Sequence, residues 1–358
     1  MATGTEKAIK ARIAAKEKDF EKLTEFEKFS QKKIENQKIA KLYYYLAENE
    51  TSQDKKKNYL KKSEQIENCG NLLTKFFDKT EVPPVIRYTA YFCHNRFCPL
   101  CLYKVSKMTF KLVLDIVNHP KAKDCSYIFM TLTVKNCKAE KFDNTVDWLL
   151  KSYNKLITNK TTQFSKRFLG TFKVLECTYN KKTHEFHLHM HILAMIEKSY
   201  FKDTKKYLTK TKLIEIWQRA LGVDYKPSVD IRATYNAEAK TVAEVSKYTV
   251  KSSEIVNADV LKTYDKGFYK RRLKSFTGLF REIRNDVIEQ WKAEKTDCVD
   301  YETIMTDDRF VKELYRWNMF KNQFEILESN KDIEQKKIDN EKIVSEIINQ
   351  IDFDDLPF

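Results

Sequence analysis

The chain is poor in glycine and proline and has no long hydrophobic run. Of its 358 residues, six are glycine and six are proline. None of these glycines lies in a phosphate-binding loop or a dinucleotide fingerprint, so ATP hydrolysis and hydride transfer are not expected. No apolar run reaches the roughly 18 residues that a membrane-spanning helix needs. The first residues are polar and lysine-rich, unlike a secretory leader, and we expect a cytoplasmic protein with no membrane partner.

What is present favours a folded, basic protein. Hydrophobic residues make up 42% and aromatic residues 13%, enough for one large domain or two smaller ones. The net charge of +15 favours a polyanionic partner, usually nucleic acid, although a basic protein without such a partner would have the same composition. Eight cysteines in a chain with this much core material indicate metal binding or free thiols rather than a disulfide scaffold.

Three of the six histidines alternate with apolar residues in one short segment. This period is typical of a β-strand and places His187, His189 and His191 on one face. The apolar face is expected to pack against helices, and the histidine face to open into a cleft. Because neutral imidazole is a common metal ligand, we predict a metal site. The alternative is a half-buried strand whose histidines face water.

A glutamate is expected beside these histidines. A second strand is predicted at 167–179, and a polar turn at 180–183 leads directly into the histidine strand, which indicates an antiparallel hairpin. In that register Glu176 lies beside His189 or His191. A lone buried carboxylate is costly, and a cation removes that cost. We therefore predict Glu176 as a ligand; an exposed or lysine-paired glutamate is the alternative.

The cysteines indicate a second metal site. Cys98 and Cys101 have the spacing of a zinc knuckle, and Cys69 and Cys93 can complete a four-thiolate tetrahedral site, with His94 as a substitute ligand. Such a zinc would be structural, because four protein ligands leave no open position. Buried free cysteines are the alternative.

The remaining periodicities predict an α+β fold. The N-terminal 1–66 should form a lysine-rich helical region, 67–285 a domain with the cysteine cluster, 286–330 a helical region and 331–358 a tail with an acidic tip. Within these, helices are expected at 104–117, 147–158, 207–221, 237–251 and 313–327, and further strands at 127–134 and 229–232.

One predicted helix carries a candidate nucleophile. Glu244 and Tyr248 are four residues apart and would share a face of the helix at 237–251. A tyrosine near a metal and a lysine, such as Lys251, can attack a phosphodiester, because positive charge stabilises the phenolate. By itself, Tyr248 would be interpreted as a packing residue.

Basic residues near aromatic ones are candidates for DNA contacts. Arg271, Arg272 and Lys274 precede two phenylalanines, a pattern that suits phosphate contacts and base stacking. Arg232 and Lys247 are further candidates. A solvated basic helix end is the alternative.

Three segments occur in a characteristic order: Phe129–Thr133, His187–His191 and Glu244–Lys251. In this order they resemble the motifs of the rolling-circle plasmid replication initiators, a branch of the HUH endonucleases. The resemblance covers roughly Cys69–Arg284, and it is the combined order that is specific. Leu188 stands where many members carry proline.

The resemblance implies the HUH endonuclease fold, a central antiparallel sheet flanked by helices, with one Mg or Mn ion. His189 and His191 would hold the ion with Glu176, and with His187 as a further candidate. Tyr248 would attack the phosphorus of single-stranded or hairpin origin DNA, forming a 5′-phosphotyrosyl link and a free 3′-OH primer.

Further expectations follow from this resemblance. Glu244 could activate water to end a replication round, and Lys251 could stabilise charge. Unwinding would come from a host helicase, and a homo-oligomer is possible. A transposase or relaxase on the same fold, or a zinc-containing DNA-binding regulator without chemistry, are the alternatives.

The last seven residues resemble the acidic tip of bacterial single-stranded DNA-binding proteins. In such tips the terminal ring fills an apolar pocket while carboxylates meet basic residues. We predict that this tip recruits host replication proteins; folding back on the basic groove or simple solubilisation are the alternatives. The residues concerned are Asp354, Asp355, Leu356, Pro357 and Phe358.

Overall fold

The computed structural model describes residues 23–78, 80, 87–159, 164–234, 239–246, 249–296 and 309–327. These residues form two compact units: the first contains 23–101 and 309–327, and the second contains the described part of 102–296. The cysteine cluster is thus grouped with the N-terminal helices, whereas the sequence analysis assigned it to the domain at 67–285. Lys247, Tyr248 and the C-terminal tip lie outside the described residues, and the predictions about them stay predictions.

The first unit combines two helices with a small sheet. Helix α2 (Glu25–Glu48) begins with a capping box, in which Thr24 and Glu27 satisfy each other's backbone N–H groups, and α3 (Gln53–Asn68) follows after a short polar link. The four-stranded antiparallel sheet has the order β2-β1-β8-β9. Its strands are β1 (Leu72–Asp78), β2 (Arg87–Ala90), β8 (Phe310–Asn318) and β9 (Gln323–Ile326).

The helix predicted at 313–327 is wrong, because this segment forms the β8–β9 hairpin. Trp317 and Phe324 are buried from the two strands and pack with Leu73 of β1. Asn322 has a φ of 53°, a left-handed conformation that ends any helical run at the turn. The aromatic residues are therefore buried by pairing with a strand far away in the sequence.

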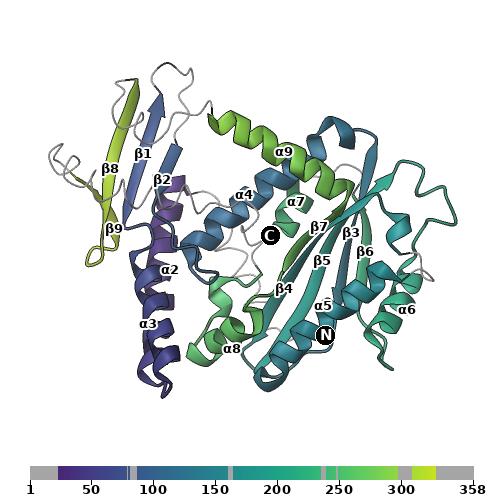
Figure 1. The fold of residues 1–358 in the computed structure, drawn as a ribbon, viewed down its shortest axis with the longest axis horizontal. Coiled ribbons are helices and arrows are strands. Elements are labelled where there is room, and N and C mark those ends of the chain that lie inside the picture. The colour runs from purple at the N-terminus through teal and green to yellow at the C-terminus, as the bar shows by residue number, and fades with distance from the viewer. Residues whose placement is uncertain are drawn as a thin grey trace, which may run out of the picture. The chain divides into compact units, whose positions relative to one another are not determined.

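The second unit is built on a five-stranded antiparallel sheet with the order β6-β3-β5-β4-β7 (Figure 1). Its strands are β3 (Cys125–Thr133), β4 (Gly170–Asn180), β5 (Glu185–Glu197), β6 (Val229–Thr234) and β7 (Lys274–Gly278). Its helices are α4 (Pro99–Asn118), in which the boundary between the units falls, α5 (Phe142–Thr158), α6 (Lys210–Leu221), α7 (Ala239–Val245), α8 (Ala258–Phe268) and α9 (Leu279–Thr296). Short 3-10 turns are η1 (Pro120–Ala122), η2 (Ala139–Lys141), η3 (Ser165–Arg167) and η4 (Ser252–Glu254).

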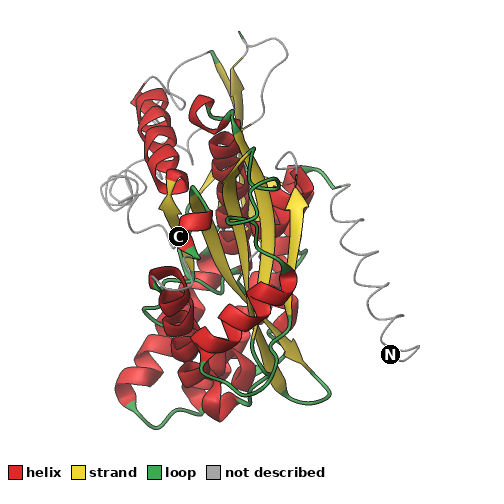
Figure 2. Cartoon of the chain, turned by 90° about the vertical axis from the view of Figure 1, so that its right-hand side faces the viewer, coloured by secondary structure: helices red, strands yellow, loops and turns green. Residues whose placement is uncertain are grey.

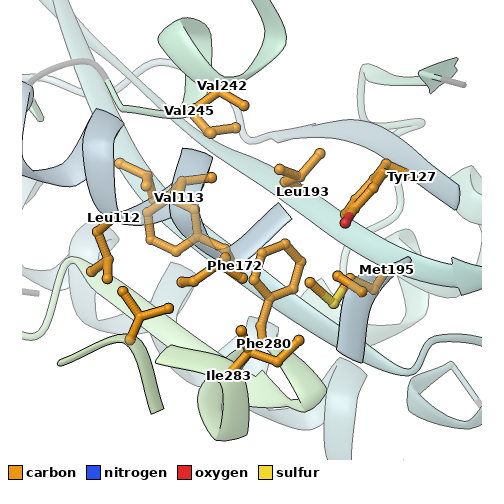
Figure 3. Close-up of a cluster of buried hydrophobic side chains, with 14 of the residues drawn as sticks. Leu112, Val113, Tyr127, Phe172, Leu193, Met195, Val242, Val245, Phe280 and Ile283 are labelled. Carbon is orange, nitrogen blue, oxygen red and sulfur yellow. The ribbon is translucent and has the colours of Figure 1, made fainter. Parts of the chain in front are cut away.

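Helices cover both faces of this sheet (Figure 2). One face packs against α4, α7 and α9 through a cluster that includes Leu112, Phe172, Leu193 and Val242 (Figure 3). On the other face, the ring of Phe186 lies 4.8 Å from that of Phe142 of α5 and 5.2 Å from that of Tyr264 of α8. The predicted α+β fold, with a central antiparallel sheet and flanking helices, is confirmed. No helix of the described part is both long and apolar enough to cross a membrane.

The helix predicted at 237–251 is shorter than expected, because α7 ends at Val245. Ser246 closes the last turn, where its hydroxyl donates to the carbonyl of Val242 at 2.6 Å. Residues 249–251 are not helical, and Lys251 has the extended conformation of the residue before η4. Lys251 therefore does not lie on the helix that carries Glu244.

Candidate functional site

The hairpin of β4 and β5 brings one carboxylate and two imidazoles together. Glu176 lies directly opposite His189 in the register. The Nε2 atoms of His191 and His189 lie 3.1 and 3.5 Å from the same carboxylate oxygen, Oε2 of Glu176. Potential ligand atoms of the three residues all lie within 4.8 Å of one another. The antiparallel hairpin register and the position of Glu176 beside His189 and His191 agree with the sequence prediction.

Burial makes this carboxylate dependent on its partners. Glu176, His189 and His191 are each about 9% exposed. Burial by itself would raise the pKa of Glu176, but hydrogen bonds from His189 and His191 outweigh it and hold the pKa well below its ordinary value. Glu176 is therefore a buried anion. Removing a carboxylate from water costs free energy, and a nearby positive charge offsets that cost.

A residue of the neighbouring strand orients one of the imidazoles. The hydroxyl of Thr131 on β3 lies 3.2 Å from Nδ1 of His191. A hydroxyl can accept a hydrogen bond from Nδ1–H, and in that tautomer a cation can take the place at Nε2 where a proton otherwise bonds to Glu176. Nδ1 of His189 is buried and has no hydrogen-bond partner among the described residues. Of the two imidazoles beside Glu176, His191 is the one whose Nδ1 has a hydrogen-bond partner among the described residues.

A chain of contacts leads from His191 to Glu244. The ring of Phe129 stacks on that of His191, with centroids 5.3 Å apart and planes 30° from parallel. Arg232 on β6 lies 4.5 Å from the centroid of the Phe129 ring, and its Nη2 donates to Oε2 of Glu244 at 2.6 Å. Arg232 is exposed. An ion pair therefore lies beside the imidazole cluster on the same face of the sheet.

The described chain neighbours of Tyr248 are held at two points. The carbonyl of Thr249 accepts a hydrogen bond at 2.8 Å from the backbone N–H of Cys177, the residue after Glu176. On the other side, the carbonyl of Ser246 accepts a bond at 2.8 Å from the hydroxyl of Ser106. The chain that continues from Tyr248 is therefore attached to the edge of β4 next to the carboxylate.

His187 does not join the cluster. Its Nδ1 donates to Oδ1 of Asn136 at 2.8 Å, and its ring centroid lies 5.1 Å from that of His189. Burial and the neighbouring His189 lower the pKa of His187. The prediction of three imidazoles pointing into an open cleft is therefore wrong. His189 and His191 are buried on the face of the sheet that packs against α7, and of the three histidines only His187 is half-exposed.

The predicted DNA-binding residues differ in their surroundings. Arg271 makes a bidentate ion pair with Asp147, with N–O distances of 2.6 and 2.7 Å, and Arg272 is exposed. Lys274 is 5% exposed and its Nζ donates to Thr109 at 3.0 Å. Burial lowers the pKa of Lys274 to about 8. The structure corrects the prediction for Lys274, because a lysine enclosed in the core cannot contact a phosphate.

The four predicted cysteines meet in the first unit. Sγ of Cys101 lies 3.6 Å from that of Cys69 and 3.7 Å from that of Cys93, and Cys98 completes a set whose sulfurs lie within 4.8 Å of one another. Hydrogen bonds from the neighbouring thiols lower the pKa of Cys69, whereas burial raises that of Cys98. His94 is not part of this set.

Two buried residues of α2 support the cysteines and were not found in the sequence analysis. Nζ of Lys33 donates to the carbonyl of Cys69 at 2.7 Å, and Oδ1 of Asn36 accepts from the backbone N–H of Leu100 at 3.1 Å. Burial lowers the pKa of Lys33 to about 8. Both are polar residues on the face of α2 that is buried. A polar residue among the apolar positions of a helix is the sequence pattern that could have identified them. The sequence analysis also did not identify Thr131 as a supporting residue, although it lies within the segment Phe129–Thr133.

The profile of a family described as "Replication protein" matches residues 86–325. "Protein rep" of Bacillus sp is 31% identical over 276 residues, which cover 69% of this chain and 87% of that protein. "Protein rep" of Lentilactobacillus hilgardii is 29% identical over 283 residues, covering 74% of this chain and 87% of that protein. No solved structure matches. The chain therefore belongs to the replication protein family, and its resemblance to the rolling-circle plasmid replication initiators is confirmed.

Proposed function

We propose that this plasmid replication initiator nicks one strand of its origin DNA, with Tyr248 as the nucleophile. The observation that carries the proposal is the buried Glu176–His189–His191 set together with the hydrogen bond that attaches Thr249 to β4 beside it. Tyr248 directly precedes Thr249 in the sequence, which supports the proposal that its phenol acts at this set.

The three side chains fit a divalent cation. One carboxylate and two imidazoles offer three donor atoms, the carboxylate is already an anion, and Thr131 can fix the proton of His191 away from Nε2. Mg²⁺ or Mn²⁺ bound there would supply positive charge that polarises a non-bridging phosphate oxygen. With three protein ligands, room for a phosphate oxygen remains, which is the feature of a catalytic site.

The phenol then carries out the covalent step. The oxygen of Tyr248 loses its proton and forms a bond to phosphorus, while the bond from phosphorus to the 3′ oxygen breaks and that oxygen takes up a proton. The products are a 5′-phosphotyrosyl link and a free 3′-OH that can prime synthesis. The link conserves the phosphodiester, so the strand can later be rejoined.

Glu244 is proposed to act at the end of a round. Its ion pair with Arg232 holds the carboxylate on the same face as the imidazoles. As a carboxylate it can take a proton from water, so that hydrolysis replaces a second tyrosine attack. We expect Glu244→Ala to keep nicking but to accumulate covalent complex or extra rounds; normal termination in this variant would count against the role.

The cysteine set is proposed to hold a structural zinc. Four thiolates within 4.8 Å match the tetrahedral sites that zinc prefers. Lys33 would offset part of the negative charge of such a site.

A covalent adduct is the direct test. The protein is incubated with Mn²⁺ and a labelled oligonucleotide of the plasmid's origin, and adducts are separated on a denaturing gel. Wild type should give an adduct and Tyr248→Phe none, whereas Tyr269→Phe, at a tyrosine that is 64% exposed, should behave as wild type. An adduct in Tyr248→Phe at the wild-type level would contradict the proposal.

A further inference from the structure

A cavity of about 400 Å³ opens at the end of the sheet where β3 leaves it. Its lining residues come from the loop after β3, from α5 and from the segment before β6. Those that carry the argument are Lys135, Asn136, Lys138, Lys141, Trp148 and Tyr225. Its volume is in the range of about 300–1,000 Å³ that is usual for pockets that hold small organic groups.

One hydrogen bond connects this cavity to the candidate metal ligands. Asn136 lines the cavity and accepts from Nδ1 of His187 at 2.8 Å, and the ring of His187 lies 5.1 Å from that of His189. A group bound in the cavity would therefore be connected to His189 through Asn136 and His187.

The lining combines aromatic rings with positive charge. Nζ of Lys135 lies 4.2 Å from the centroid of the Tyr225 ring, and the backbone N–H of Lys135 donates to the hydroxyl of Tyr225 at 3.3 Å. The indole of Trp148 is half-exposed and is held by a hydrogen bond at 3.1 Å from its Nε1 to the carbonyl of Leu221. Both rings are thus fixed by their polar atoms; Lys135 covers one face of the Tyr225 ring, and we take the other face of Tyr225 and the exposed part of Trp148 as the stacking surfaces.

Charge in the cavity is mixed but lysine-rich. Lys138 and Lys141 join Lys135, while Glu140 and Glu185 are the acidic lining residues. Lysines contact phosphates without reading sequence, and aromatic rings stack on any base. A nucleotide supplies both a flat apolar base and an anion, so it matches this combination better than a purely anionic or purely apolar ligand does.

We propose that this cavity binds one nucleotide of single-stranded DNA that flanks the cleaved phosphate, with the base against Tyr225 and Trp148 and the adjoining phosphate at Lys135. This inference rests on the proposed nicking function, since it takes the neighbouring His189 to hold the phosphate that is cut. The cavity would thereby position the DNA strand, so that one particular phosphate is placed at Glu176, His189 and His191.

Binding is measured apart from cleavage to test this. The probe is fluorescein-labelled (dT)20, followed by anisotropy without added divalent cation. Tyr225→Ala should weaken binding about 5- to 100-fold, the loss of about 1–3 kcal/mol of stacking. Tyr225→Phe should stay near wild type because it keeps the ring. Tyr207→Ala, at a tyrosine that is 46% exposed and outside the cavity, is the matched control.

A second probe separates the base from the phosphate. With the bases removed from the oligonucleotide, Tyr225→Ala and wild type should bind alike, whereas Lys135→Ala should weaken binding to both probes. Binding of (dT)20 by Tyr225→Ala within twofold of wild type would overturn the proposal. Should that variant fail to fold, photocrosslinking of wild type to an oligonucleotide that contains 5-iododeoxyuridine replaces it. Crosslinks to Tyr225 or Trp148 are expected, and crosslinks confined to other residues would refute the assignment.

These readouts keep the two proposals apart. If Tyr248→Phe abolishes the adduct while Tyr225→Ala leaves (dT)20 binding unchanged, the nicking function stands and the nucleotide site falls. If Tyr225→Ala weakens binding but Tyr248→Phe still forms an adduct, the choice of nucleophile is wrong and the cavity remains a DNA site.

Discussion

The described part of the chain holds two clusters of potential metal ligands that differ in the type and number of their ligand atoms. The cluster in the first unit has four cysteine sulfurs, and the cluster in the second has one carboxylate and two imidazoles. Thiolates suit zinc, while carboxylate and imidazole also suit harder divalent ions. Four protein ligands complete a tetrahedral site, whereas three leave a position for substrate. From the number and type of ligands, we therefore expect the cysteine cluster to stabilise the fold and the cluster of Glu176, His189 and His191 to take part in catalysis.

The supporting residues differ in the same way. Lys33 and Asn36 are buried on α2 and bond to the backbone beside the cysteines. Around the imidazoles, the supporting contacts lead outward through Phe129 to the exposed Arg232. The first set is supported by buried polar residues, and the second has contacts that reach the surface.

The largest expected effect is at the three-ligand cluster. His191→Ala removes a donor atom and should slow nicking about 1,000-fold or more, because metal-assisted charge stabilisation contributes several kcal/mol to catalysis. Single-turnover cleavage of labelled origin DNA measures this effect. His184→Ala is the control, since His184 is exposed and its Nδ1 bonds to the hydroxyl of Tyr179, which is not part of the cluster. Cleavage by His191→Ala near the wild-type rate would end the catalytic interpretation of the cluster.

The next effect concerns the cysteine cluster and should appear in stability rather than chemistry. Cys98→Ala should abolish zinc content and lower the free energy of unfolding by several kcal/mol, because a structural zinc stabilises only the folded state. Metal analysis and thermal unfolding check this, with the half-buried Cys125→Ala as control. If the variant unfolds as wild type but nicks slowly, the roles of the two clusters have been exchanged.

A smaller effect is expected one contact away from the imidazoles. Thr131→Val keeps the branched shape but removes the hydroxyl beside Nδ1 of His191, and it should lower Mn²⁺ affinity about 10- to 100-fold. Calorimetric titration measures the affinity. Thr133→Val on the same strand serves as control, because that hydroxyl donates to the carbonyl of Ser228 instead. Equal losses in both variants would point to strand damage.

The smallest effect is expected at Lys33. Replacing Lys33 by Met removes positive charge near the thiolates, so zinc should leave to a competing chelator about tenfold faster. Lys28→Met on the same helix, where Lys28 pairs with Glu25, should retain the wild-type rate. An unchanged release rate in Lys33→Met would show that its hydrogen bonds to carbonyls serve the fold alone.

The parts that the sequence predicted depend on local patterns. The alternation around His189 requires a strand, and the short turn before it leaves little choice of register, so Glu176 could be placed opposite. The spacing of Cys98 and Cys101 similarly indicates a knuckle. In both cases the information lies within a few residues or within one hairpin.

The parts that were missed depend on contacts between distant segments. Tyr315 pairs with Leu73 of β1, and no local pattern in 313–327 announces a strand partner so far away in the sequence. The end of α7 at Val245 is similar, because the bond from Cys177 to Thr249 draws the chain to the edge of β4. The helical spacing of apolar residues predicted a longer helix, because a local pattern carries no information about a hydrogen bond to a distant strand.

The central claim is that a cation held by Glu176, His189 and His191 lies within reach of the phenol of Tyr248. A crystal structure of the protein with Mn²⁺ and an uncleaved origin oligonucleotide tests it most directly through the anomalous signal of manganese. The account predicts a peak at coordination distance from the three side chains, with the scissile phosphate between it and the oxygen of Tyr248. A peak elsewhere, or a Tyr248 oxygen remote from that phosphate, would contradict it.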